Sequence, residues 1–181
     1  MVLTLTFLGV GSAFAKRSFH SNALIEAWTD GPSRQDKPDC TLLIDFGATG
    51  PTALHQLKSK PGFAYLDVGG VINYPAIERV LITHLHSDHI GGLEEMAGMR
   101  RHFFGRDTSG AGVKPTLIGT PEVLTDLWAH SLSGGLSAAG GARLELEDYF
   151  EVQPVQPHGT GHPDRISLLD RFEFALIPTD H

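Results

Sequence analysis

The sequence predicts a single α/β domain on three observations: its length, its composition, and an alternation of strand patterns with helical patterns. The chain has 181 residues, which is enough for one hydrophobic core. A hydrophobic fraction of 41% and a charged fraction of 19% are typical of folded proteins, and 21 glycines and 11 prolines predict many turns. We therefore expect one domain over residues 1–181.

The first part of the chain predicts three strands and a helix. Residues 3–9 (LTLTFLG) alternate small polar and large apolar side chains, and the following GVGSAF predicts a turn rather than a phosphate-binding loop. SNALIEAW and CTLLIDFG predict two further strands, joined by a polar connection that contains proline. We expect an antiparallel meander, followed by a helix with Thr49 as its N-cap and Pro51 near its start.

Strands and helices alternate in the rest of the chain. Residues 80–82 and the stretch KPTLIGT predict buried strands, and PEVLTDLWAHSL predicts a helix with Thr120 as N-cap and Pro121 in the first turn. The stretch LEEMAGMRRHFF predicts another helix. Its inward residues would be Leu93, Met96 and Phe103 or Phe104, and its outward residues Glu94, Arg100 and Arg101. The tail, from RLELEDYFEVQPV to RFEFALIPTDH, predicts two strands around a loop.

The net charge and the cysteine content argue against some classes of function and structure, beginning with binding of long nucleic acid. A net charge of −7 and a pI near 5.7 disfavour binding of long nucleic acid, although a local basic patch or a metal could still support it. The single cysteine, Cys40, excludes an internal disulfide and is most simply a small buried hydrophobe. Neither a signal-peptide pattern nor an apolar run of about 20 residues is found, so we expect a soluble cytoplasmic protein.

The stretch THLHSDHIGG places three histidines and one aspartate within six positions, directly after a buried strand. The carboxyl end of a strand is where sites of α/β proteins tend to lie. Imidazole and carboxylate are ligands that zinc, manganese and iron accept. The spacing H-x-H-x-D-H therefore predicts a metal site rather than a chance cluster of surface histidines.

The stretch THLHSDHIGGLEE also resembles the signature of the metallo-β-lactamase-fold hydrolases. LTFLGVGSAF, SNALIE and LLIDFG follow the order and spacing of the branch that contains RNase Z, so the resemblance covers nearly the whole chain. Within this branch, LWAHSLSGGLS followed by LEDYFEV looks more like the anti-Pycsar cyclic-nucleotide phosphodiesterases than like tRNA-processing RNase Z. The resemblance implies an αββα sandwich, of which this chain holds the N-terminal portion.

The resemblance further implies roles for individual residues. His84 and His86 would bind a first metal, Asp88 and His89 a second, and His181 would be the third histidine of the first metal. Asp88 would also act in catalysis by holding the attacking water. The family pattern continues with a bridging aspartate and a last histidine that the sequence does not contain. We therefore expect a fragment with weak or single metal binding.

Asp45, in LLIDFG, resembles an aspartate that orients the metal loop without binding a metal itself. In a complete site, two divalent ions, zinc or manganese, would share a hydroxide that attacks a phosphodiester. The expected substrate is a small cyclic nucleotide. The alternatives are an RNase Z-like tRNA 3′ endonuclease, a hydrolase of another substrate such as a lactone or thioester, and an impaired nucleotide-binding module.

Other residues carry weaker signals. Two histidines in the loop PHGTGHP are more often exposed than functional; they are His158 and His162. His20 would either border the site or be a partly buried polar residue. Three histidines on predicted helices are expected to be structural: His55, His102 and His130. Three apolar residues of LWAHSLSGGL are expected in the core or in a homodimer contact: Trp128, Leu132 and Leu136.

Overall fold

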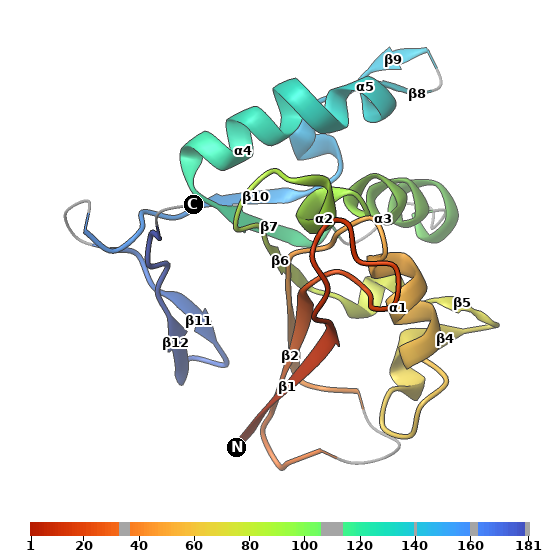
Figure 1. The fold of residues 1–181 in the computed structure, drawn as a ribbon, viewed down its shortest axis with the longest axis vertical. Coiled ribbons are helices and arrows are strands. Elements are labelled where there is room, and N and C mark those ends of the chain that lie inside the picture. Colours follow the sequence, from red (N-terminus) through yellow and green to blue (C-terminus); the bar gives the residue numbers. More distant parts are fainter. Residues whose placement is uncertain (33–36, 106–113, 140, 160–162, 180–181) are drawn as a thin grey trace.

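The structure, a computed structural model, describes residues 1–32, 37–105, 114–139, 141–159 and 163–179. These residues form a six-stranded sheet with helices and three two-stranded hairpins (Figure 1). The sheet has the strand order β1-β2-β3-β6-β7-β10. Its strands are β1 (Val2–Gly9), β2 (Asn22–Trp28), β3 (Cys40–Ile44), β6 (Arg79–Leu81), β7 (Thr116–Gly119) and β10 (Glu151–Pro154).

The sheet is antiparallel at one edge and parallel at the other. β1, β2 and β3 pair antiparallel, which confirms the predicted meander. β3, β6, β7 and β10 pair parallel to their neighbours. The carboxyl ends of the parallel strands therefore lie on the same side of the sheet, and the histidine stretch follows the carboxyl end of β6 there.

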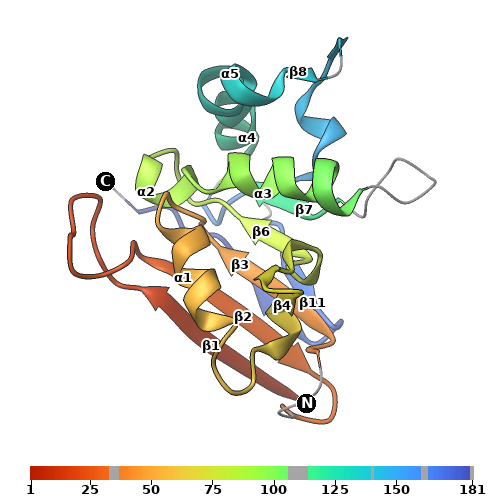
Figure 2. The same cartoon turned by 90° about the vertical axis from the view of Figure 1, so that its right-hand side faces the viewer.

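Side chains that alternate along the strands bury both faces of the sheet. One face packs against the helices, and its strand residues include Leu24, Leu43, Val80 and Leu117. The other face packs against the hairpin of β11 (Ile166–Leu168) and β12 (Phe172–Phe174), and its strand residues include Ile25, Leu42, Leu81, Ile118 and Cys40. Cys40 is thus buried, as predicted. Figures 1 and 2 show α1 and α3 on the first face, with the β11-β12 hairpin on the second.

The helices are short, and two of them continue into π-helical turns. The α-helices are α1 (Gly50–Leu57), α2 (Ser87–Ile90), α3 (Leu93–Met99), α4 (Pro121–Leu127) and α5 (Ser133–Leu136). The π-helices are Arg100–Phe104 and Trp128–Leu132, and the 3-10 helices are Ala64–Leu66, Tyr74–Ala76 and Leu146–Asp148. The remaining hairpins pair β4 (Asp67–Val68) with β5 (Val71–Ile72) and β8 (Ala138–Ala139) with β9 (Ala142–Arg143). In the described part of the chain, no helix has the length and apolar character needed to span a bilayer.

The prediction for the helix over residues 93–104 was wrong for Arg100, which was expected outward and is buried at 5% exposure. Leu93 and Met96 are buried as expected. Of the two alternatives for the last inward position, Phe104 packs against the core and Phe103 is 54% exposed. The π-helical turn advances each side chain by less than an α-helical turn, so the faces that an α-helical period assigns no longer apply. The Arg100 guanidinium donates hydrogen bonds from Nη1 to two main-chain carbonyls, those of Tyr74 and Ile77.

Two threonines begin helices, and only one caps its helix through the side chain. The Thr120 hydroxyl oxygen accepts from the Val123 N–H at 3.3 Å, as predicted. Thr49 occupies the N-cap position of α1, but its side chain makes no cap hydrogen bond. Its hydroxyl oxygen instead accepts from the His20 N–H at 2.8 Å, which attaches the loop before β2 to the start of α1.

The tail contains three strands where two were expected. The stretch LEDYF begins with a 3-10 turn, and β10 then runs parallel to β7. β12 ends at Phe174, so residues 175–179 do not continue the strand toward His181 as predicted. Among the described residues, these five have no partner strand to extend the hairpin.

Candidate metal centre

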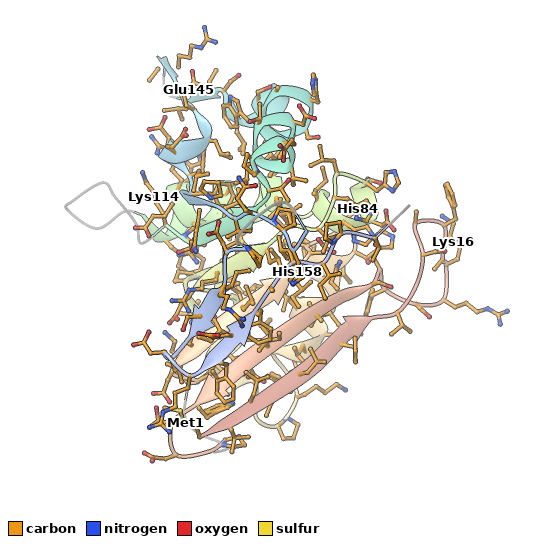
Figure 3. The ribbon with its side chains drawn as sticks, turned by 90° about the vertical axis from the view of Figure 1, so that its left-hand side faces the viewer. Met1, Lys16, His84, Lys114, Glu145 and His158 are labelled. Carbon is orange, nitrogen blue, oxygen red and sulfur yellow. The ribbon has the colours of Figure 1, made fainter. Side chains whose placement is uncertain are left out.

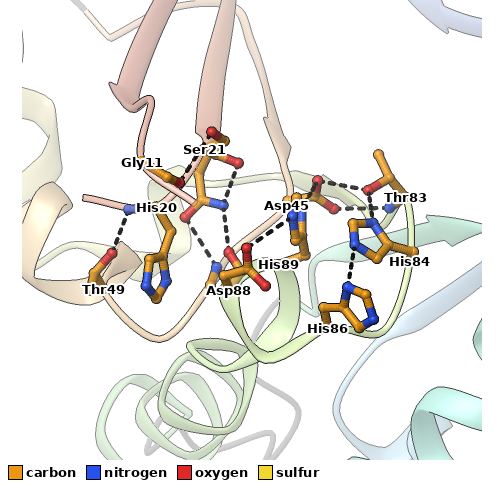
Figure 4. Close-up of polar contacts among 12 residues, drawn as sticks. Gly11, His20, Ser21, Asp45, Thr49, Thr83, His84, His86, Asp88 and His89 are labelled. Carbon is orange, nitrogen blue, oxygen red and sulfur yellow. Dashed lines mark hydrogen bonds and ion pairs between the residues drawn. The ribbon is translucent and has the colours of Figure 1, made fainter. Parts of the chain in front are cut away.

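The histidine stretch leaves β6 and turns at once into α2 (Figure 4). The Ile82 N–H donates to the Ile118 carbonyl at 2.9 Å, which keeps the chain at the sheet edge up to this residue. His86 is extended at the N-cap of α2, and its carbonyl accepts from the His89 N–H at 2.8 Å. This turn brings the His89 ring to 3.9 Å from the His84 ring, measured between centroids.

Residues 45–48 cross the turn of residues 87–92 and bind it through main-chain hydrogen bonds. The Phe46 N–H donates to the His89 carbonyl at 2.6 Å, and the Gly92 N–H donates to the Phe46 carbonyl at 2.8 Å. We call this contact the main-chain crossing. It holds the histidine stretch against residues 45–48 through main-chain atoms.

Gly47 and Asn22 make the main-chain crossing possible. A Cβ atom on Gly47 would lie 1.8 Å from the carbonyl oxygen of Asp88, so only glycine permits this approach. The buried Asn22 side chain joins the same two residues: its Oδ1 accepts from the Gly47 N–H at 3.1 Å and its Nδ2 donates to the Asp88 carbonyl at 3.3 Å. Sequence reasoning missed Asn22; its one signal was a polar residue at the start of a buried strand.

Asp45 joins Thr83 to His89. Its carboxylate accepts from the Thr83 N–H at 2.9 Å and from the Thr83 hydroxyl at 2.8 Å, and it lies 2.7 Å from His89 Nδ1. Asp45 is 4% exposed and has a φ of +57°, a left-handed conformation in which aspartate is enriched. These contacts are those expected of a residue that orients the histidine stretch, although that role stays a prediction.

The hydrogen bonds of Asp45 determine which nitrogens of two histidines carry protons. A carboxylate only accepts, so His89 Nδ1 carries a proton, and in the neutral ring the lone pair is then on Nε2. Thr83 gives its single hydroxyl proton to Asp45, so its oxygen accepts from His84 Nδ1 at 3.0 Å. His84 therefore also presents Nε2 with a lone pair, the form in which imidazole binds metals.

The candidate donor atoms lie in two pairs. His84 Nε2 is 3.2 Å from His86 Nδ1, and Asp88 Oδ2 is 3.4 Å from His89 Nε2. Two ligands of one tetrahedral zinc ion, with bonds of roughly 2.05 Å, are about 3.3 Å apart. Each pair thus fits two neighbouring ligands of one metal ion in chemistry and in spacing. The pairing is the one that the resemblance implied.

A complete ligand set is not found in the described part of the chain. There, no three histidine, cysteine, aspartate or glutamate side chains form a group that could hold a metal ion. His181, the expected third ligand of the first metal, lies outside the described residues. The roles of the two pairs and of His181 as metal ligands, and of Asp88 in catalysis, therefore stay predictions.

Comparison with known proteins identifies the family. The sequence profile of the family described as "Anti-Pycsar protein Apyc1" matches residues 3–181. This chain belongs to the Apyc1 family. The Apyc1 protein of Paenibacillus sp. (strain J14) is 40% identical over 181 residues, which make up 100% of this chain and 59% of that protein. The Apyc1 protein of Bacillus phage vB_BsuM-Goe3 is 35% identical over 177 residues, 98% of this chain and 57% of its own length. This chain thus spans less than two thirds of the length of these relatives.

Two solved structures confirm the predicted fold. The metallo-β-lactamase fold protein YhfI from Bacillus subtilis matches 92% of this chain and 50% of its own, with a TM-score of 0.53 and 15% identity. Unliganded yeast PDE1 matches 86% of this chain and 51% of its own, with a TM-score of 0.57 and 16% identity. The Apyc1-family chain therefore has the α/β arrangement of the metallo-β-lactamase fold over about half the length of these structures.

A pocket of about 500 Å³ borders the histidine stretch of the Apyc1-family chain. It lies between His84 and the segment that precedes His158 (Figure 3). We call it the His84 pocket. Its lining residues are Thr83, His84, Thr120, Pro157, Leu176, Ile177, Pro178 and Thr179.

The weaker candidates divide into buried and exposed residues. His20 is buried beside the site (Figure 4), and its Nδ1 has no hydrogen-bond partner among the described residues. His158 is exposed as expected, and His162 lies outside the described residues. The helical histidines are also exposed: His55, His102 and His130. Burial of Leu132 and Leu136 confirms the core interpretation for both, and Trp128 packs partly against that core. The homodimer stays a prediction.

Proposed function

We propose that this Apyc1-family protein is a metal-dependent phosphodiesterase that hydrolyses a cyclic nucleotide. The proposal is based on two closely spaced pairs of candidate metal ligands after the carboxyl end of β6: His84 with His86, and Asp88 with His89. Membership of the Apyc1 family and the likeness of the fold to that of a metallo-β-lactamase fold protein support a hydrolase.

Divalent ions at these pairs, zinc or manganese by the chemistry of the donors, would supply an activated water and positive charge opposite the phosphodiester. The chain's own residues prepare this site. Asp45 orients the His89 ring, and Thr83 orients the His84 ring, so that each presents a lone pair on Nε2. In this proposal Asp88 holds the attacking water and accepts its proton. The phosphate group would lie against the two donor pairs.

The test compares turnover of 3′,5′-cyclic nucleotides by the full-length protein and its variants. We expect His86→Ala and Asp88→Asn each to lower kcat/KM by at least about 100-fold, because each removes one member of a donor pair. The matched control is His130→Ala, since His130 is exposed and its ring pairs with Asp126 at 3.7 Å on the same helical stretch. Unchanged turnover in both site variants would contradict the proposal.

A second candidate function is a nucleotide-binding module without turnover. It is favoured by the observation that no three-ligand metal group occurs among the described residues. Equilibrium dialysis of cyclic nucleotides against the full-length protein, followed by chromatography of the recovered nucleotide, separates the two functions. Tight binding with intact cyclic nucleotide after prolonged incubation with zinc or manganese would favour the binding module.

A further inference from the structure

We propose that the His84 pocket is the subsite for the base of the cyclic nucleotide, with Ile177 and Thr120 as its specificity-determining residues. The inference rests on the proposed function, because that function places the phosphate at the donor pairs. A phosphate group bound there lies directly beside the pocket, since His84 belongs both to a donor pair and to the pocket lining.

The charge of the lining favours a base over a phosphate. Apart from His84, the lining side chains are threonines, prolines, a leucine and an isoleucine, none of which carries a charge. The basic residues Lys16 and Arg17 line a different pocket, together with His20. An anion would find no cationic lysine or arginine side chain in this lining, whereas the apolar face of a nucleobase would replace water against its walls.

The walls are held in place by one contact between segments. The His158 N–H donates to the Leu176 carbonyl at 2.7 Å, which joins the segment after β10 to the segment after β12. Pro157 and Pro178 restrict the backbone of each wall. The pocket of about 500 Å³ lies within the common range for small-molecule sites, roughly 300–1,000 Å³. It therefore offers a preformed slot of suitable size for a base.

Ile177 and Thr120 offer the base two different contacts. Ile177 lines the pocket and is 75% exposed, so its aliphatic side chain is accessible to the face of a base. The Thr120 oxygen accepts from the Val123 N–H, so its hydroxyl proton is available to an acceptor in the pocket. A base that stacks on Ile177 and presents a carbonyl oxygen or ring nitrogen to Thr120 would use both contacts.

The experiment measures kcat and KM of the full-length protein for the four common 3′,5′-cyclic nucleotides. Inhibition by the matching nucleosides and by inorganic phosphate is measured in parallel. For Ile177→Glu we expect KM to rise at least tenfold with kcat within twofold, nucleoside inhibition to weaken by the same factor, and phosphate inhibition to stay unchanged. Val68→Glu is the matched control, because Val68 is an exposed aliphatic residue outside this pocket.

Thr120 is tested by base preference. Thr120→Ala should bring the KM values for the four cyclic nucleotides closer together. Thr120→Ser keeps both the helix cap and the hydroxyl, so it should preserve the differences in KM. A general loss of helix stability would raise all four KM values together and leave the ratio unchanged, and that result would overturn the role of Thr120. Ile177→Ala serves as a milder variant where thermal unfolding shows that Ile177→Glu is unfolded.

The outcomes separate this inference from the proposed function. Cyclic-nucleotide turnover that is unaffected by both Ile177 variants would overturn the base subsite and leave the phosphodiesterase standing. Nucleoside binding that depends on Ile177 in a wild-type protein without turnover would support the subsite and overturn the phosphodiesterase. Equal effects of Ile177→Glu and Val68→Glu, or a fall in kcat at constant KM, would assign Ile177 to the fold and overturn the subsite.

Discussion

Gly47 lies where two segments of the site come closest. Because a Cβ atom there would lie 1.8 Å from the Asp88 carbonyl oxygen, Gly47→Ala must displace the backbone of one segment. We expect it to lower the unfolding free energy by about 1–3 kcal/mol and to weaken zinc binding at least tenfold. Thermal unfolding and zinc titration measure both. The control is Gly134→Ala in α5, where nothing lies within 4 Å of the added atom; there we expect equal or higher stability.

Asp45 acts on two histidines, directly on His89 and through Thr83 on His84. Asp45→Asn replaces one acceptor oxygen by a donor, which must face either the Thr83 N–H at the Oδ1 position or both the Thr83 hydroxyl and the His89 N–H at the Oδ2 position. We expect zinc affinity to fall about 10- to 100-fold, as for other residues that orient metal-binding histidines. Competition with a fluorescent chelator measures it. Asp126→Asn, which alters an exposed aspartate–histidine pair, should leave the affinity unchanged.

At this scale the sequence indicated which candidate side chains lie together, but not what supports them. The proximity of His84, His86, Asp88 and His89 was predictable because they are neighbours on one turn, and their role as ligands stays a prediction. The contact between Asn22 and Asp88 joins positions 66 residues apart, and a sequence pattern carries no information about such pairs.

At the scale of the elements, Arg100 shows how a π-helical turn changes what a helix buries. Its guanidinium donates to the carbonyls of Tyr74 and Ile77, and so attaches the end of α3 to the segment before β6. Burial lowers the pKa of Arg100 to about 10. Because this value is still well above neutral pH, the side chain remains charged there. Sequence reasoning assigned it outward because it assumed an α-helical period and because arginine is mostly exposed.

We expect Arg100→Met to destabilise the protein by about 1–3 kcal/mol, because the hydrogen bonds from Arg100 to the buried carbonyls of Tyr74 and Ile77 are lost. Chemical denaturation measures the change. Arg143→Met is the matched control, since the Arg143 side chain is 87% exposed; its effect should stay within about 0.5 kcal/mol. Equal effects of the two variants would show that Arg100 does not stabilise the segment before β6.

For the molecule as a whole, two tyrosines link stability to alkaline pH: Tyr74 is buried and Tyr65 is partly buried. Burial raises the pKa of Tyr65 and Tyr74, and hydrogen bonds to Glu26 at 2.6 Å and Glu95 at 2.7 Å raise them further. The unfolded chain loses these protons near pH 10 while the folded protein keeps them, so stability falls as the pH rises above 10. The expected loss is about 1.4 kcal/mol per tyrosine by pH 11.

Urea denaturation between pH 9 and pH 11 tests this link. In the double variant Tyr65→Phe with Tyr74→Phe, the free energy of unfolding should fall less over this range than in the wild type, with a difference of about 2.8 kcal/mol at pH 11. A decline as steep as that of the wild type would assign the alkaline sensitivity to other groups.

The metal content of residues 1–181 is a further property of the whole molecule. We expect this polypeptide, expressed alone, to bind one metal ion weakly and to hydrolyse cyclic nucleotides slowly, because each of the two donor pairs supplies two ligands. Elemental analysis together with intact mass and turnover measures this. Two tightly bound ions per chain with rapid turnover would contradict it.

The fold was predictable in its local parts and not in its assembly. The period of two in residues 3–9 and the turn signals around it predicted the meander correctly. The parallel order β3-β6-β7-β10 depends on pairing between strands that lie far apart in sequence, which no local pattern specifies. The end of β12 depends on whether a neighbouring strand is present, and residues 175–179 have a strand-like sequence without one in the described part of the chain.

The main-chain crossing has a consequence for how the site opens. The Phe46 amide is bonded to the His89 carbonyl, and the Gly92 amide is bonded to the Phe46 carbonyl, so separation of the two segments breaks both hydrogen bonds together. In amide hydrogen–deuterium exchange these two protons should behave as members of one cooperative unit, with equal protection and equal response to denaturant. Thermal fluctuation would then expose the histidines all together or not at all.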